Sequence, residues 1–165
     1  MSAPAPRVSA ATPAKAGTPV PARRTLLTFR LQGEIFAIEV ERVREIIDPL
    51  PAIRVPHASA FAPGLINVRG SVVPVVALRQ RLGIAPAERT ADSRMVVLDV
   101  ALGEETTRLA IEADAVEQVL DLDANAIEPV PEIGVGWPTG YLAGIAKRGG
   151  DLVVLLKTEA VFEPG

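Results

Sequence analysis

Two polar side chains, Asn67 and Arg69, lie two positions apart in the aliphatic stretch GLINVRGSVVPVVALRQRLG at residues 64–83. An amide that orients a water molecule and a guanidinium that holds an anion could together hydrolyse an acyl phosphate. No phosphate-cradling glycine loop accompanies them, and an unpaired guanidinium costs too much free energy to bury. We therefore expect Arg69 at a rim, where it either pairs with a carboxylate such as Glu45 or contacts a partner molecule.

The rest of the chain offers little for catalysis or metal binding. His57 is the only histidine, it lies between Pro56 and Pro63 in an expected loop, and no second type of metal ligand clusters near it. The absence of cysteine excludes disulfides, thiolate metal sites and thiol nucleophiles. The glycine-rich residues 134–138 neither follow a strand nor open a helix, as a dinucleotide-binding loop must. The sequence thus predicts no enzyme, no metal and no cofactor.

The aliphatic residues around Asn67 and Arg69 predict the strands that position them. Residues 64–68 and 72–77 form two β-type runs, and Gly70-Ser71 is expected to supply the tight turn of a hairpin that needs neither polar side chain for its own folding. Residues 43–48 also fit a helical stripe, but strand is the preferred interpretation. Further strands are expected at 26–31, 35–40, 95–100, 107–113, 116–122, 141–147 and 152–156, with helical turns at 78–82 and 157–162.

The second half of the chain repeats the plan of the first. GIAKRGGDLVVLL from Gly144 aligns with the segment from Gly64 at an offset of 80, and AIEADAVEQVLD at 110–121 aligns with AIEVERVREIID at 37–48 at an offset of 73. Five short strands are too few for an open sheet to protect its edges, so each half is expected to close into a small barrel. The expected boundaries are about 25–90 for the first barrel and about 91–160 for the second.

Composition separates a tail from a folded body. Residues 1–22 are rich in alanine and proline and contain no acidic residue, which predicts a disordered tail. Residues 23–165 form the body, which is acidic and therefore a poor candidate for binding a phosphate backbone, although a small-barrel nucleic-acid binder remains the alternative class. No apolar run is long enough to span a membrane and no secretory signal is visible, so a soluble, cytoplasmic protein is expected.

Taken together, these segments resemble the CheW family of bacterial chemotaxis coupling proteins. The motifs that look like the family signature are IRVP at 53–56, GLINVRG at 64–70, VPVV at 73–76 and LRQRLG at 78–83. FAIEVERVREI, AVEQVL, YLAGIA and DLVVLL look like its other strands, in order and without large gaps from residue 25 to about 162. The sequence departs from the family at Ala77 and Lys157, where aspartate is frequent, and at Ala110, where glycine is frequent.

The resemblance implies an all-β fold of two tandem SH3-like five-stranded β-barrels packed together, and an adaptor without catalytic activity. Its partners would be the cytoplasmic tips of chemoreceptors and the regulatory domain of the histidine kinase CheA, in arrays at the membrane face and in rings with the kinase. Receptor binding would fall in the groove between the barrels, at Val43, Glu45, Gly64, Asn67, Arg69 and Gly70. Kinase binding would fall on aliphatic barrel ends, with the candidates Val97, Leu109, Ile111 and Ala113, although these four also suit an ordinary core.

Overall fold

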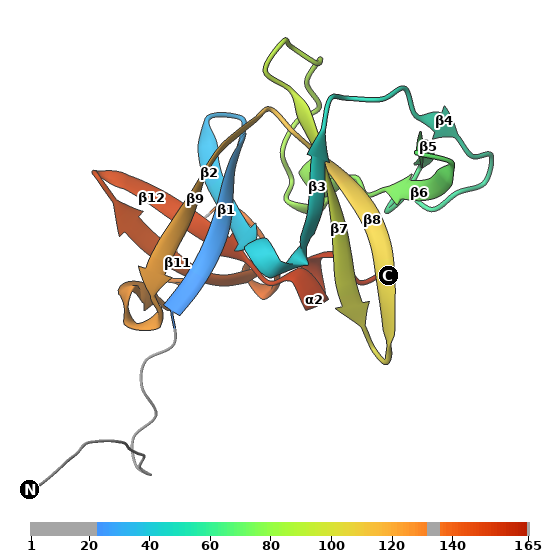
Figure 1. Ribbon diagram of the computed structural model, residues 1–165. Coiled ribbons are helices and arrows are strands. Elements are labelled where there is room, and N and C mark those ends of the chain that lie inside the picture. Colours follow the sequence, from blue (N-terminus) through green and yellow to red (C-terminus); the bar gives the residue numbers. More distant parts are fainter. Residues whose placement is uncertain (1–22, 132–135, 165) are drawn as a thin grey trace, which may run out of the picture.

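The structure is a computed structural model that describes residues 23–131 and 136–164 (Figure 1). The expected tail, residues 1–22, lies outside the described residues. In the first half the elements are β1 (Arg23–Leu31), β2 (Glu34–Glu39), the 3-10 turn η1 (Val40–Arg42), β3 (Val43–Ile47), β4 (Ile53–Arg54), β5 (Gly64–Val68), β6 (Ser71–Val75) and the helical turn α1 (Leu78–Arg81). In the second half they are β7 (Arg94–Leu102), β8 (Glu105–Ala113), β9 (Ala115–Asp123), η2 (Ala124–Ala126), β10 (Ile127–Glu128), η3 (Thr139–Tyr141), β11 (Leu142–Arg148), β12 (Asp151–Leu156) and α2 (Thr158–Val161).

All ten expected strands are present, and the ambiguous residues 43–48 are a strand, β3. The short strands β4 and β10 are additional. The all-β class is therefore confirmed. No helix in the described part of the chain is long and apolar enough to cross a membrane.

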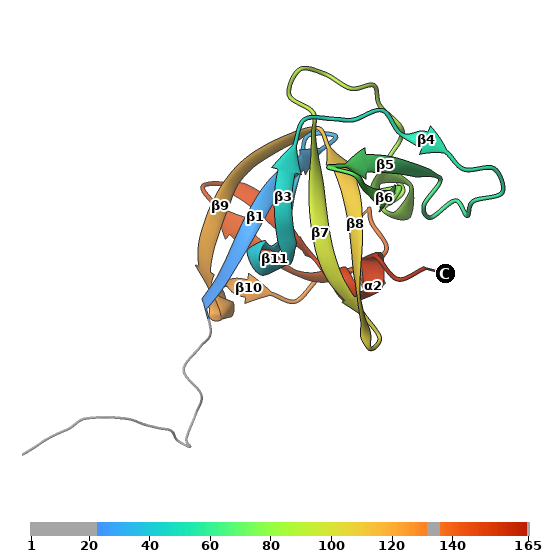
Figure 2. The same ribbon diagram turned by 45° about the vertical axis from the view of Figure 1, so that its right-hand side comes forward.

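The strands form two six-stranded sheets with the same internal plan. Their orders are β10-β11-β12-β2-β1-β9 and β4-β5-β6-β8-β7-β3, so each strand of one sheet has its repeat-equivalent at the same place in the other. Each sheet curls into a small SH3-like barrel, as Figures 1 and 2 show. The repeat is thus a structural one as well as a sequence one.

The expected barrel boundaries are wrong, because the two halves exchange strands. One sheet is built from residues 43–113, whereas the other combines β1 and β2 with β9 to β12 from the far end of the chain. Only Asp114 separates β8 from β9. A single residue cannot form the loop of at least two residues that a hairpin needs, so the chain continues into the other sheet.

The largest hydrophobic core lies between the two sheets. It joins residues of one sheet, such as Phe29 and Phe36, to residues of the other, such as Leu98 and Leu109. Each sheet also has a smaller cluster made of its own strands, one around Leu26 and one around Ile66. Because alternate residues of a strand face opposite sides, β1 contributes Leu26 to its own barrel and Leu27 to the shared core. The two barrels are therefore held by one common core.

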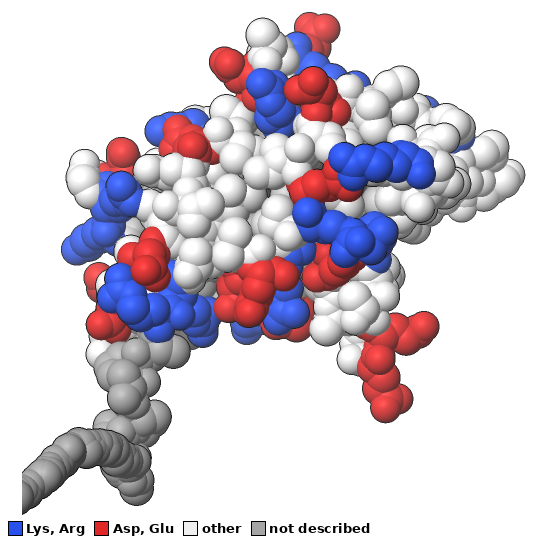
Figure 3. Space-filling view, viewed as in Figure 1, with Lys and Arg blue, Asp and Glu red and all other residues white. Residues whose placement is uncertain are grey.

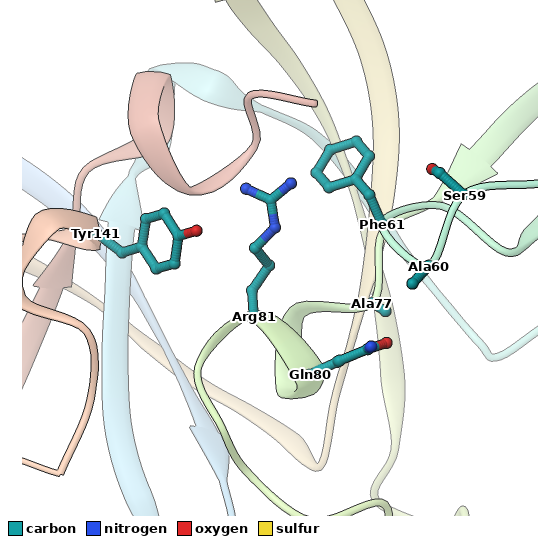
Figure 4. A pocket seen from close by; sticks show the side chains of 7 residues that line it. All are labelled: Ser59, Ala60, Phe61, Ala77, Gln80, Arg81 and Tyr141. Carbon is teal, nitrogen blue, oxygen red and sulfur yellow. The ribbon is translucent and has the colours of Figure 1, made fainter. Parts of the chain in front are cut away.

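Arg81 joins the two halves on the side of α1 and α2. Its guanidinium lies between two aromatic rings, 4.3 Å from the ring centre of Phe61 and 5.6 Å from that of Tyr141 (Figure 4). Its Nη1 donates a hydrogen bond of 3.2 Å to the carbonyl oxygen of Val161 in α2. Phe61 and Tyr141 are equivalent in the repeat, so Arg81 lies where the two halves face each other.

Candidate partner-binding site

The tip of the β5–β6 hairpin is a two-residue turn of Arg69 and Gly70. Val68 pairs with Ser71, and the backbone φ angles of Arg69 and Gly70 are +52° and +86°. Positive φ at both central residues is the requirement of a type I′ hairpin turn. The expected turn at Gly70-Ser71 is therefore wrong by one residue. Asn67 also takes part in folding, because its side-chain oxygen accepts a hydrogen bond of 2.8 Å from the backbone N–H of Gly70.

Arg69 occupies a backbone position that glycine fills in the other half. The equivalent β11–β12 turn is Gly149-Gly150, with φ angles of +55° and +89°. Left-handed backbone is unfavourable for a residue with a Cβ atom. The Arg69 side chain is 77% exposed, and its Nη1 lies 2.8 Å from the carboxylate of Glu45. Because such an exposed ion pair contributes only about 0–1 kcal/mol, folding alone does not account for arginine at this turn.

Arg69 lies at the edge of a shallow polar hollow of about 530 Å³. Its lining residues are Glu41, Arg42, Val43, Arg44, Glu45, Arg69 and Asp99. Asp99 accepts hydrogen bonds from Arg44 at 3.3 Å and from Arg108 at 3.0 Å. The hollow thus combines η1, β3, β7 and the hairpin tip, at the point where the chain passes from one sheet to the other.

An uncharged strip borders this charged region. Figures 1 and 2 show β3 between β1 of one sheet and β7 of its own. Figure 3 shows an area without charged side chains over β9 and β1 that reaches as far as β3. Ile46 of β3 and Val119 of β9 are exposed and equivalent in the repeat. Their cross-strand neighbours, Val96 and Leu27, belong to the core between the sheets. Neither residue was predicted from the sequence as part of a site, although the alignment of the two halves places them at equivalent positions.

The structure brings together five of the six residues expected to bind a receptor. Val43, Glu45 and Arg69 line the hollow, and Asn67 and Gly70 form the turn that carries Arg69.

Gly64 lies apart, buried at the opposite end of β5. A Cβ atom there would lie 3.2 Å from the Cβ of Ala52, a tight contact that favours glycine where the chain passes close to β4. The equivalent Gly144 has the same role against Ile127. The explanation for Gly64 is therefore packing.

The four candidates for kinase binding are not on the surface. Val97, Leu109, Ile111 and Ala113 are each at most 1% exposed. They lie on β7 and β8, whose two faces are covered by the shared core and by the barrel's own core. The expectation that these side chains contact a partner is therefore wrong.

Other aliphatic residues are exposed at the barrel ends. Val72 of β6 and Leu152 of β12 are 68% and 53% exposed, and they are equivalent in the repeat. Ile53 of β4 is also exposed and pairs with Leu65, which in turn pairs with Pro74. Each barrel thus presents an apolar position at the same place.

The surroundings of Asn67 and Arg69 do not assemble a hydrolytic site. The Asn67 side-chain oxygen is used by the turn, and Arg69 points to solvent beside Glu45. His57 is exposed in the loop between β4 and β5, with a φ of +64°. Within residues 23–131 and 136–164, no group of three or more His, Asp or Glu side chains is arranged to hold a metal ion.

The second half lacks the charged pair of the first. Glu45 is replaced by Gln118 and Arg69 by Gly149 at the equivalent positions. Glu117, next to Gln118, pairs instead with Arg30 of β1, and this hydrogen bond raises the pKa of Arg30 above the usual value. The pairing of an exposed arginine at the hairpin tip with a carboxylate of the exchanged strand is therefore not repeated at the equivalent positions of the second half.

Comparison with known proteins identifies the family of the chain. Residues 25–164 match the family described as the CheW-like domain. The chain is 34% identical over 139 residues to the "Probable chemotaxis protein CheW" of Rhizobium etli, covering 84% of this chain and 87% of that protein. It is 32% identical to the "Chemotaxis protein CheW" of Rhizobium meliloti, with the same coverage of 84% and 87%. The crystal structure of the scaffolding protein TtCheW from Thermoanaerobacter tengcongensis superimposes with a TM-score of 0.76 at 28% identity, covering 93% of this chain and 96% of that one. The chain therefore belongs to the CheW-like family.

Proposed function

We propose that this chain is a non-enzymatic adaptor of a bacterial chemosensory pathway. It couples the cytoplasmic tips of chemoreceptors to the regulatory domain of the histidine kinase CheA, and it works at the cytoplasmic face of the membrane within receptor arrays. Family membership over residues 25–164 supports the pathway. The observation that supports coupling most directly is Arg69, an exposed guanidinium held on a left-handed backbone beside the hollow.

Receptor binding is proposed for the hollow together with the uncharged strip beside it. Ile46 and Val119 offer apolar area, and the Arg69–Glu45 pair offers charge at the rim. An amphipathic helix packs its apolar face on such a strip and places polar residues against the rim. Exposed charges then mainly select the partner and its orientation, because they contribute little to the fold.

Kinase binding is proposed for the exposed aliphatic positions Val72 and Leu152, one on each barrel. A partner that is itself built from two such barrels can dock on either end. These contacts are head to tail, and they close into rings when the rotation between chains allows it. Two separable kinase-binding surfaces follow from this arrangement.

The test uses the purified chain, a receptor cytoplasmic-tip fragment and CheA. We expect the chain to co-purify with both partners and to raise kinase activity in receptor arrays. Leu152→Asp should weaken the one-to-one complex with the kinase, whereas Val72→Asp should disturb array assembly only. Glu104→Gln, in the exposed β7–β8 turn, is the control that should change neither readout.

Two results would contradict the proposal in different ways. Equal weakening of the one-to-one complex by Leu152→Asp and Val72→Asp would show that the two ends do not act separately. Failure of the unmodified chain to bind either partner would refute the adaptor function itself.

A further inference from the structure

Arg42 in η1 contains an unsatisfied buried atom. Within the described residues, its Nε is the one buried side-chain nitrogen or oxygen that has no hydrogen-bond partner. Native proteins satisfy nearly all such groups, because a buried donor without an acceptor loses its hydration and gains nothing in return. An exception of this kind is a position where an acceptor from outside the folded chain, such as a water molecule or a partner side chain, can bind.

Arg42 also lines the hollow beside Arg69. The two other arginines of the lining have carboxylate partners, since Arg44 pairs with Asp99 and Arg69 pairs with Glu45. The ion pairs found among the described residues do not include Arg42. Arg42 is thus the arginine of the hollow that remains available to an incoming anion.

The repeat shows that the fold does not require arginine at this position. Arg42 is replaced by Ala115 in the second half, at the start of the equivalent strand β9. The same comparison replaces Arg44 by Glu117 and Arg69 by Gly149. The first half therefore gathers three guanidinium groups around one hollow, and the second half has none at the equivalent positions.

We propose that Arg42 binds a carboxylate of the receptor tip and that this contact satisfies its Nε. A guanidinium offers two parallel N–H donors to the two oxygens of a carboxylate, which makes aspartate or glutamate its best protein partner. Nε has no acceptor in the free chain, so bringing it to a carboxylate exchanges an unsatisfied donor for a charge-assisted hydrogen bond. The side chain turns toward the hollow to present Nε to the carboxylate. This inference rests on the proposed receptor binding and identifies the chemistry of the receptor side chain.

The discriminating variant is Arg42→Met, which keeps most of the apolar stem and removes the guanidinium. Because a buried unsatisfied group is lost, the melting temperature should stay the same or rise. The dissociation constant for a receptor cytoplasmic-tip fragment should increase by about tenfold, the effect of one charge-assisted hydrogen bond. Affinity for the kinase should not change. A purely structural arginine would give the opposite pattern, with a lower melting temperature and unchanged binding.

Controls separate charge from geometry. Arg23→Met removes one positive charge from an exposed ion pair between Arg23 and Asp121, both of which lie on the sheet that does not contain β3. This variant should leave receptor affinity unchanged. Arg42→Lys keeps the charge but lacks Nε, so it should recover only part of the lost affinity. Full recovery with lysine would overturn the role of Nε.

The receptor residue is found by a double-mutant cycle. Each acidic residue of the receptor fragment is neutralised in turn, and one of them should show a non-additive effect with Arg42→Met. If every neutralisation were additive, the proposed carboxylate contact would be wrong.

Arg69→Glu, measured in the same assay, distinguishes the two proposals. Loss of binding with Arg69→Glu but not with Arg42→Met would refute the Arg42 contact and leave receptor binding at the hollow standing. No binding by the unmodified chain would refute the proposed function.

Discussion

Replacing Arg69 with glycine separates recognition from folding, because glycine is the residue that the equivalent turn already contains. Glycine accepts the left-handed φ of +52° without the cost of roughly 1 kcal/mol that a Cβ atom brings. Against this gain, the change removes an exposed ion pair worth about 0–1 kcal/mol. It also raises the conformational entropy of the unfolded chain, which lowers the free energy of unfolding by about 0.5–1 kcal/mol. These contributions nearly cancel, so the free energy of unfolding should change by less than about 1 kcal/mol.

The assay compares thermal melting with binding to a receptor cytoplasmic-tip fragment. For a chain of this size, a change below 1 kcal/mol moves the melting temperature by no more than about 4 °C. Binding should nevertheless weaken by about tenfold or more, because the exposed guanidinium is gone.

The matched control is Gly149→Arg, which puts arginine into the equivalent turn at a φ of +55°. This variant should lose about 1 kcal/mol of stability, because arginine now bears the left-handed backbone, and it should gain no receptor affinity. Two results would refute the reasoning. Wild-type binding by Arg69→Gly would remove Arg69 from the interface, and a collapse of the fold would show that Arg69 is structural.

Three further predictions concern stability and are measured by denaturant unfolding. Ile66→Ala should lower the free energy of unfolding by about 2–4 kcal/mol, because Ile66 is 1% exposed in a barrel core; a small effect would mean that the cluster collapses around the cavity. Gly144→Ala should cost about 1–3 kcal/mol, because a Cβ atom collides with the side chain of Ile127, whereas Gly140→Ala, with nothing within 4 Å, should cost little; equal effects would argue against a packing role. Arg81→Met should lower the free energy of unfolding by about 1–2 kcal/mol, because its aromatic contacts and its carbonyl hydrogen bond are lost; an unchanged unfolding curve would show that these contacts do not stabilise the fold.

The sequence predicts strands well where a short aliphatic run is bounded by turn residues, as in β5 and β6. It does not reveal which sheet β1 and β2 join, because the two halves are chemically alike and either pairing buries the same side chains. The exchange depends on the length of the connections, and the single residue Asp114 is its clearest sign. That sign becomes meaningful only when the exact ends of β8 and β9 are known.

Candidate site residues are easiest to predict from the sequence where a side chain is hard to explain by folding. Arg69 stands out because an aliphatic hairpin does not need a guanidinium to fold. Gly64 belongs to the same sequence motif, but its position in the structure is explained by close packing. The alternation of Leu109, Ile111 and Ala113 correctly marks one apolar face. Whether that face meets solvent or the second sheet depends on tertiary packing, and the pattern of apolar residues along a strand does not specify its packing partner.

The exchange of strands has a consequence for how the chain is made. A ribosome releases β1 and β2 first, yet their partners β9 to β12 are the last strands to be synthesised. The barrel of residues 43–113 is continuous in sequence, so all of its strands leave the ribosome before β9 to β12 do. At that stage the barrel that contains β1 and β2 still lacks four of its six strands. The edges of the β1–β2 hairpin therefore stay unpaired until the end of translation. Unpaired strand edges are where strands of different nascent chains form non-native pairs. In biosynthetic terms, the last third of the chain closes a barrel that the first residues began.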